Sequence, residues 1–202
     1  MANVEINLTN IEKLTKQLEK ANRIGIKVGV NDSMQYKNGK KPIKVGKVAE
    51  YLEYGWTQTV KPKQSKWFKA QGIYNIKAGT TLNNPPRPFF GATARAKKAE
   101  WQRLGVQLLH GLPASDNPLN KIMQAFEFLG MKAVQDIQDT ILNGGVEGVE
   151  FALRSPLTML MYGKLSAGHK TDGTGTLSSN KPLNKSGLLL NSIAFEITTK
   201  IK

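Results

Sequence analysis

The chain has 202 residues, of which 40% are apolar and 22% charged, and its 29 Lys and Arg against 15 Asp and Glu give a formal charge of +14. This composition is ordinary for a globular protein and the length suits one sizeable domain, which argues against wholesale disorder. The chain contains no cysteine, which excludes disulfides, thiolate catalysis and zinc–sulfur or iron–sulfur sites, and no window approaches the ~18 apolar residues of a membrane span.

The N-terminal region is predicted to open with a strand, a helix and a second strand. Residues 4–8 alternate as a short strand does, and residues 11–21 place apolar side chains at the spacing of an amphipathic helix. Residues 24–30 are predicted to form a strand and residues 34–41 an exposed turn. The first residues lack the apolar core of an export signal, so we expect a soluble chain made in the cytoplasm.

Three shorter elements are predicted next. Residues 45–54 place apolar side chains on one helical face, and Gly55 stands where a left-handed residue would end the helix. Residues 61–69 predict a short basic helix, because a proline stands near its start and lysines recur along it. Residues 73–82 are expected to be extended, and residues 83–84 to form a turn ahead of the prolines that follow.

Residues 87–109 and 117–142 are predicted to form two long helices. In each segment apolar side chains recur every three or four residues, and turn-forming residues separate the two. The inward positions expected in the first helix are Phe90, Ala94, Trp101, Leu104 and Leu108. Those expected in the second are Ile122, Phe126, Leu129, Ala133, Ile137 and Ile141. Gly144 and Gly145 should end the second helix, and the two helices should pack against each other and against a sheet.

The C-terminal part is predicted to contain a loop, a brief helix and a last strand. Residues 166–181 are rich in Gly, Ser and Thr, the composition of a flexible loop. Residues 185–192 predict a brief helix, and residues 193–201 alternate as a strand. We therefore expect an α+β fold forming a single domain over residues 1–202, with one curved, mixed or antiparallel sheet packed by the two long helices.

The positive charge is concentrated in the first half of the chain. Residues 1–103 carry 20 Lys and Arg against 7 Asp and Glu, and 14 of these basic residues lie within residues 37–98 beside only Glu50 and Glu53. Such asymmetry indicates a polyanionic neighbour, either nucleic acid or an acidic protein surface, and a solvated basic face is the alternative. The residues expected to face DNA or an acidic partner are Lys40, Lys41, Lys44, Lys47, Lys61, Lys63, Lys66, Lys69, Arg95, Lys97 and Lys98.

The chain shows no pattern that predicts a catalytic, cofactor or metal site. Residues 163–171 resemble a phosphate-binding loop, but a histidine displaces the lysine and no helix follows. The two histidines do not have the spacing of a metal-ligand pair. The acidic pairs Glu50/Glu53 and Asp136/Asp139 stand one helical turn apart and could share a metal, although solvated helix faces explain them better. We therefore expect a protein that is not an enzyme and that uses no cofactor.

Three motifs occur in a fixed order from about residue 45 to the end. Residues 53–68 combine Glu-Tyr-Gly with Thr-Val-Lys-Pro-Lys-Gln-Ser-Lys-Trp-Phe, and residues 86–90 read Pro-Arg-Pro-Phe-Phe. The third motif joins Ser-Pro-Leu-Thr at 155–158 to Pro-Leu, Ser-Gly-Leu and Asn-Ser-Ile within 182–193. Together they resemble the tail-completion and neck proteins of tailed bacteriophages, in particular the virion-morphogenesis group that includes the Mu-type proteins. Lys185 and Ser186 stand where that group usually has Asp-Thr.

The resemblance implies a structural protein of the virion neck or upper tail. Such a protein forms a homo-oligomeric ring at the head–tail junction, with six copies expected and twelve as the alternative. Its neighbours would be the connector or head-closure protein on one side and the tail terminator or tail tube on the other. Non-specific contact with genomic DNA is expected, and no membrane is involved.

Aromatic residues in the basic region are the expected contacts for assembly. Trp56, Trp67 and Phe68 could stack on bases as in single-strand binders, but core or interface packing is favoured because no strand repeats the aromatic–basic pairing. Prolines stiffen the chain ahead of Phe89 and Phe90, which are then presented to the domain core or to a neighbouring subunit. The expected interface residues are Trp56, Trp67, Phe68, Arg87, Phe89 and Phe90. The alternative function is a free basic nucleic-acid-binding protein.

Overall fold

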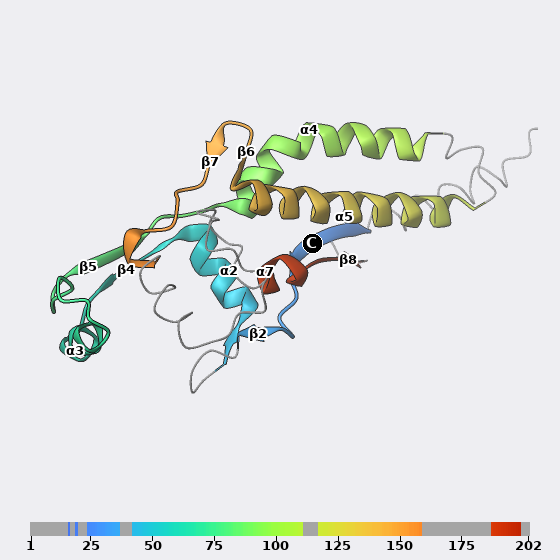
Figure 1. Cartoon of the computed structure of the whole chain (residues 1–202). Coiled ribbons are helices and arrows are strands. Elements are labelled where there is room, and N and C mark those ends of the chain that lie inside the picture. The colour runs from blue at the N-terminus through green and yellow to red at the C-terminus, as the bar shows by residue number, and fades with distance from the viewer. Residues whose placement is uncertain are drawn as a thin grey trace, which may run out of the picture.

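The computed structural model describes residues 24–36, 42–110, 117–158 and 187–198, together with Lys16 and Glu19 (Figure 1). Lys16 and Glu19 are helical and exposed, and the rest of the expected opening strand and helix lies outside the described residues. So do the tip of the turn at 37–41 and the polar loop at 166–181. The described part of the chain combines helices with small antiparallel sheets.

The longest helices, α4 (Phe89–Leu109) and α5 (Pro118–Asn143), lie side by side as an antiparallel hairpin (Figure 1). Helix α5 begins at Asn117, whose side chain accepts a hydrogen bond from the Asn120 N–H (3.3 Å), and its first residue is a proline, which has no N–H to leave unpaired. It ends at Gly144, whose φ of 76° and ψ of 25° are left-handed. The predicted bounds of both helices are confirmed to within two residues.

Strands β1 (Gly25–Val30) and β8 (Ile193–Thr198) pair in antiparallel register, with Val28 opposite Phe195. Helix α5 packs on this ribbon, and α4 lies on the other side of α5 (Figure 1). Both strands agree with the prediction, but the single curved sheet packed by two long helices is not confirmed. The described strands form four two-stranded antiparallel ladders, and α5 lies between α4 and the β1–β8 ribbon.

The main core lies where α5 meets helix α2 (Val45–Tyr54), helix α7 (Leu188–Ser192) and the β1–β8 ribbon. Its innermost side chains come from four separate elements and are Val45, Phe89, Ile141 and Leu189. The bounds of α2 agree with the prediction. Gly55 follows it with a φ of 72° but a ψ of 176°, so it adopts a conformation essentially restricted to glycine and not the expected left-handed helical one.

Two small hairpins complete the body of the molecule. Strand β2 (Gln35–Tyr36) pairs with β3 (Ile43–Lys44), so the predicted exposed turn is the start of a short hairpin. Strand β6 (Gly145–Val146) pairs with β7 (Val149–Glu150) directly after α5.

The expectation that residues 73–82 are extended is confirmed only at its end, since Thr81 and Leu82 belong to the strand β5 (Thr81–Asn84). Residues 73–80 form no strand and include a turn at residues 78–79, with Gly79 at a φ of 88°. The expected turn at 83–84 is part of β5. Ile73 and Ile76 are buried three residues apart, a spacing that folded turns provide and an alternating strand does not.

One inward position of α4 is also corrected. Ala94 is exposed, and the side chains that α4 buries completely near its start are Phe89, Ala92 and Thr93. Thr93 is buried because its hydroxyl donates to Thr140 Oγ1 on α5 (2.7 Å), and Thr140 in turn donates to the Asp136 carbonyl (2.9 Å). Periodicity of apolar residues does not reveal this face because threonine counts as polar.

The contact between α5 and β8 depends on Gly130. A Cβ at this position would lie 2.6 Å from Cγ of the Phe195 ring, closer than real Cβ atoms approach any neighbour. We expect Gly130→Ala to lower the free energy of unfolding by about 1–3 kcal/mol, because overpacking outweighs the better helix propensity of alanine. Urea denaturation measures the change.

Gly105→Ala is the matched control for this prediction. Gly105 also lies within a helix, and a Cβ there would meet Leu129 Cδ1 at an ordinary 3.4 Å. Alanine should therefore leave stability unchanged or raise it by up to about 1 kcal/mol through helix propensity. Equal losses at both glycines would contradict the assigned packing of Gly130.

Candidate functional site

The most distinctive surface of the protein is a projecting segment, residues 56–84, which we call the basic arm. It consists of strand β4 (Trp56–Thr59), helix α3 (Pro62–Ala70) and strand β5. Strands β4 and β5 pair antiparallel from Trp56 opposite Asn84 to Thr59 opposite Thr81. This ribbon extends away from the body of the molecule and carries α3 at its far end (Figure 1).

A small core of its own gives the basic arm a defined shape. Val60, Ile73 and Ile76 are buried together, and the side chains that pack against them are Phe68, Leu82 and Leu157. The Ser65 hydroxyl donates to the Ile76 carbonyl (3.1 Å), which joins α3 to the turns that follow it. Leu157 comes from the segment after β7, so a part of the chain outside the arm also packs against its core.

Two residues hold the base of the basic arm. Gly55 enters β4 with positive φ, and a Cβ there would lie 2.6 Å from the Asn84 carbonyl oxygen, so the two strands meet too closely for any other residue. Between β5 and α4 the buried Arg87 donates from Nε to the Ala152 carbonyl (3.0 Å) and from Nη2 to the Leu153 carbonyl (3.3 Å). The arm therefore leaves the body at a fixed place.

Glu53 fixes the start of α4 next to this base. Its two carboxylate oxygens accept hydrogen bonds from the backbone N–H groups of Phe90 and Gly91, each at 2.9 Å. A carboxylate at a helix N-terminus satisfies amides that have no helical partner and complements the helix dipole. The interpretation of Glu53 as part of a solvated helix face is therefore wrong, whereas Glu50 is exposed and pairs with Lys47 (2.8 Å).

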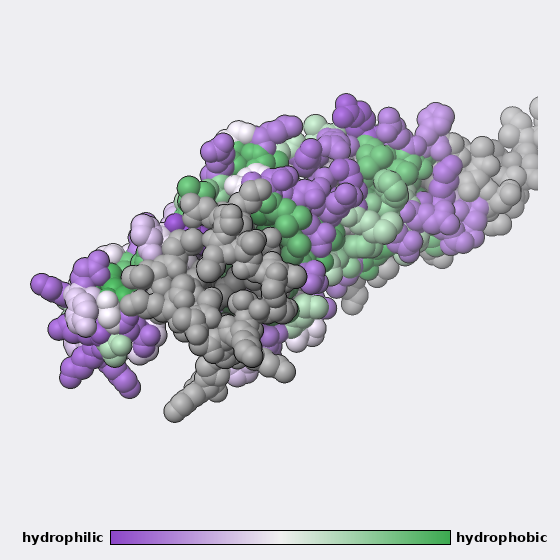
Figure 2. Space-filling view, viewed as in Figure 1, coloured by the Kyte–Doolittle hydropathy of each residue, from purple (hydrophilic) through white to green (hydrophobic). Residues whose placement is uncertain are grey.

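The basic arm carries charge of one sign only. Its sequence contains five lysines and no acidic residue, and all five lysines are exposed. They are Lys61, Lys63, Lys66, Lys69 and Lys77. Within the described residues no ion pair joins these lysines to a carboxylate. Hydrophilic surface dominates the α3 end of the arm in Figure 2.

Large aromatic side chains lie on the same arm. Trp67 is 48% exposed and packs edge-on against Phe68, with ring centroids 5.2 Å apart. Tyr74 is 71% exposed on the turn after α3, and Trp56 is partly exposed on β4. Phe68 by contrast belongs to the arm's own core. The predicted interface residues Trp56 and Trp67 are thus on the surface, where a partner can contact them.

The other predicted interface residues are placed differently. Phe89 is fully buried in the main core and Arg87 is buried at the base of the arm, so neither is available to a neighbouring subunit. Their assignment to an assembly interface is corrected: the rigid segment after the prolines serves the core of the chain itself. Phe90 is partly buried against the same core, with its ring centroid 4.8 Å from that of Phe89.

The remaining predicted basic residues differ in how available they are to a partner. Lys44 pairs with Asp32 (3.5 Å) and Lys47 with Glu50 (2.8 Å) beside an open depression of about 670 Å³ next to α2. Lys97 pairs with Glu100 (3.1 Å). Arg95 and Lys98 are exposed on α4, and Lys40 and Lys41 lie outside the described residues. Of the predicted set, the structure brings Lys61, Lys63, Lys66 and Lys69 together on the basic arm, and it places Arg95, Lys97 and Lys98 apart from them on α4.

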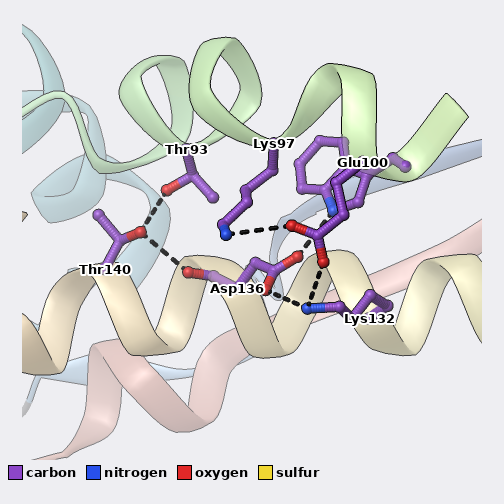
Figure 3. Close-up of polar contacts among 7 residues, drawn as sticks. Thr93, Lys97, Glu100, Lys132, Asp136 and Thr140 are labelled. Carbon is purple, nitrogen blue, oxygen red and sulfur yellow. Dashed lines mark hydrogen bonds and ion pairs between the residues drawn. The ribbon is translucent and has the colours of Figure 1, made fainter. Parts of the chain in front are cut away.

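A second polar cluster lies between α4 and α5, and the sequence interpretation did not predict it (Figure 3). Asp136 is buried, and its carboxylate accepts from Trp101 Nε1 (2.7 Å) and from Lys132 Nζ (2.6 Å). Lys132 also pairs with Glu100 (3.3 Å). The interpretation of Asp136 as part of a solvated helix face is therefore wrong. Its place three residues after the buried Ala133 and directly before Ile137 is the signal in the sequence.

Charge pairing in this cluster shifts the pKa values of Glu100 and Lys132. Hydrogen bonds from Lys97 and Lys132 hold the pKa of Glu100 below its usual 4.5, and the hydrogen bond to Asp136 raises the pKa of Lys132 above its usual 10.5. Both shifts favour the charged forms. The charged groups of this cluster are paired with one another, and their hydrogen bonds and ion pairs join α4 to α5.

The described residues contain neither a metal-binding cluster nor a membrane-spanning helix. In the part of the chain that the structure describes, no group of three or more His, Asp or Glu residues is arranged to hold a metal ion. His110 is exposed, and His169 lies outside the described residues. No described helix combines the length and the hydropathy that crossing a bilayer requires.

Comparison with protein-family models, with curated proteins and with solved structures finds no match to this chain.

Proposed function

We propose that this chain is a structural protein of a tailed bacteriophage, assembled as a homo-oligomeric ring in the virion neck or upper tail. Six copies are expected, with twelve as the alternative, between the connector or head-closure side and the tail terminator or tail tube. The observation that carries the proposal is the basic arm, a braced projection with five exposed lysines, no acidic residue and exposed Trp67 and Tyr74.

The motifs that resemble phage neck proteins lie close together in the fold, which supports the proposal. Glu53 from the first motif bonds to the start of α4, where the second motif lies. Arg87 of the second motif bonds to carbonyls just ahead of the third, and Leu157 of the third packs on the core of the arm. Motifs far apart in the chain thus form the base of one surface feature.

In this proposal the arm contributes to assembly through shape and charge. A projection whose conformation is already defined loses little entropy when it meets a partner. Its lysines attract either an acidic rim of an adjacent ring or the genomic DNA that passes through the junction, because unpaired charges of one sign generate a long-range field. Trp67 and Tyr74 then supply apolar area that can be buried on contact.

The proposal is tested by the assembly of the purified full chain and by a gene deletion. Electron microscopy and mass photometry, with and without the adjacent neck proteins, should show rings of defined copy number. Deleting the gene from its phage should leave filled heads and separate tails. A chain that stays monomeric with those partners and is absent from finished particles would rule the proposal out.

A second candidate function is a free nucleic-acid-binding protein, which the exposed aromatics beside the arm's lysines favour. Stacking of bases on aromatic rings, combined with lysine–phosphate contacts, is how sequence-tolerant single-strand binders work. Salt titration of DNA binding separates the two candidates. Tight, steeply salt-dependent binding by a monomer would favour this second candidate over the ring.

The arm should account for most of the chain's attraction to polyanions. We expect Lys63→Gln/Lys66→Gln to weaken duplex DNA binding and to reduce the slope of log K against log salt by about 0.9 for each phosphate that a lysine no longer neutralises. Fluorescence anisotropy at several salt concentrations measures both quantities.

The control removes the same amount of charge elsewhere. Lys16→Gln/Lys27→Gln replaces two exposed lysines that lie outside the arm, and Lys27 is 3.8 Å from Glu196. This double variant should leave the slope of log K against log salt nearly unchanged. Equal changes in the two double variants would mean that net charge, and not the arm, determines binding.

A further inference from the structure

The outer side of α4, away from α5, is basic and contains one large exposed apolar residue. Helix α4 contacts α5 through Trp101, and its opposite side presents Arg95, Lys98, Arg103 and Val106, all exposed. Val106 is 72% exposed. No ion pair is formed by these three basic side chains among the described residues. We call these four residues the α4 face.

The exposed side of α5 has the opposite character. Helix α5 turns Asp136 towards α4 and Gly130 towards β8, and the arc left over carries Glu127, Phe128, Met131, Asp139 and Leu142 beside the uncharged Gln124 and Gln135. Phe128 is 47% and Met131 55% exposed. Glu127 and Asp139 form no ion pair with other described residues, so the stripe is acidic and apolar. We call it the α5 stripe, and Figure 2 shows apolar surface along this hairpin between hydrophilic side chains.

We propose that neighbouring copies of this chain meet head to tail, with the α4 face of one copy on the α5 stripe of the next. This inference rests on the ring of the proposed function and specifies its subunit interface. The occupant of the stripe is a second copy because the chain itself offers the complementary surface: unpaired basic charge around Val106 opposite unpaired acidic charge around Phe128 and Met131.

Charge also decides which surfaces meet. Two α4 faces against each other would bring Arg95, Lys98 and Arg103 next to their own copies, and two α5 stripes would do the same with Glu127 and Asp139. Like charges across an interface are unfavourable, so the α4 face pairs with the α5 stripe and neither surface pairs with itself. The ring of the proposed function requires this contact to be heterologous, because a heterologous contact generates a ring when its rotation closes, whereas an isologous contact stops at a dimer. Burial of the exposed apolar side chains then adds to the attraction.

Engineered cysteines test the arrangement without background, because the chain has no cysteine of its own. Val106→Cys and Met131→Cys are made as separate full-length variants with different tags, co-expressed, and treated with a bifunctional maleimide. Both side chains are more than half exposed, so the substitutions should leave the fold intact. We expect cross-linked heterodimers in the co-expressed sample and no dimers when either variant is expressed alone.

Charge reversal provides the second measurement. Adding Arg95→Glu/Arg103→Glu to the Val106→Cys variant should reduce cross-linking to the level of the single-variant samples. Adding Glu127→Lys/Asp139→Lys to the Met131→Cys variant as well should restore it, since opposite signs then face each other again.

The outcomes separate this inference from the proposed function. Dimers formed by one cysteine variant alone, or cross-linking that is insensitive to charge reversal, would overturn the head-to-tail contact. Rings seen by electron microscopy with no cross-linking in any sample would overturn it while leaving the proposed function intact. A chain that is monomeric in every sample and forms no rings with its neck partners would overturn both.

Discussion

Replacing Phe89 by alanine is expected to lower the free energy of unfolding by about 3–5 kcal/mol, the range found for buried aromatic side chains. Phe89 is 0% exposed and lies with Val45, Ile141 and Leu189 in the main core. Its removal takes away transfer free energy and leaves a cavity that α2 and α5 can fill only in part. Chemical denaturation of the full chain measures the loss.

The control for Phe89 is another large aromatic residue from the predicted interface set. Trp67 is 48% exposed, so Trp67→Ala should change the free energy of unfolding by less than about 1 kcal/mol. Trp67→Ala should impair assembly or DNA binding more than Phe89→Ala does, since Trp67 is accessible to a partner. A Phe89→Ala variant with native stability and impaired assembly would show that the core assignment is wrong.

Replacing Asp136 by alanine is expected to lower the free energy of unfolding by about 3 kcal/mol. The change leaves the Trp101 N–H without its acceptor and removes the closest partner of Lys132, which is 2.6 Å away. The expected loss is at the lower end of the range for broken buried ion pairs because Lys132 is partly exposed and keeps Glu100 as a partner. The α4–α5 hairpin should loosen first, which hydrogen exchange of its amides can detect.

Two further variants make the Asp136 prediction specific. Asp139→Ala removes an exposed carboxylate from the same helix and should change stability by less than about 0.5 kcal/mol. Asp136→Asn keeps the shape and an acceptor for Trp101 but loses the charge, so its loss of unfolding free energy should lie between those of Asp136→Ala and Asp139→Ala. If the two alanine variants were equally stable, the buried network would contribute nothing.

Local signals are sufficient for the helices and for the two longest strands, β1 and β8. Helices α2, α3, α4 and α5 lie close to their predicted bounds, because their apolar spacing, prolines and terminal glycines act within a few residues. Strands β1 and β8 follow from their sequences for the same reason. The prediction for residues 73–80 fails because the buried Ile73 and Ile76 belong to an irregular segment, which has no periodic signature.

For the candidate site, sequence determines the charge and the structure determines its availability. The run of lysines without acidic residues is visible from composition alone, since it is a property of the chain and not of its folding. Its presentation on one projecting arm depends on Gly55, on Arg87 and on Leu157, the last of which lies far along the chain from the arm that it braces. The same packing places Phe89 in the core and takes it out of the predicted interface.

The sequence by itself determined where the helices and the strands β1 and β8 form and where positive charge accumulates. Only the tertiary structure decided which polar residues are buried, as with Thr93 against Thr140 and Trp101 against Asp136. The physical reason is that a polar side chain leaves water only when a partner replaces the lost hydrogen bonds. Those partners stand 47 and 35 residues away, beyond the reach of any local pattern.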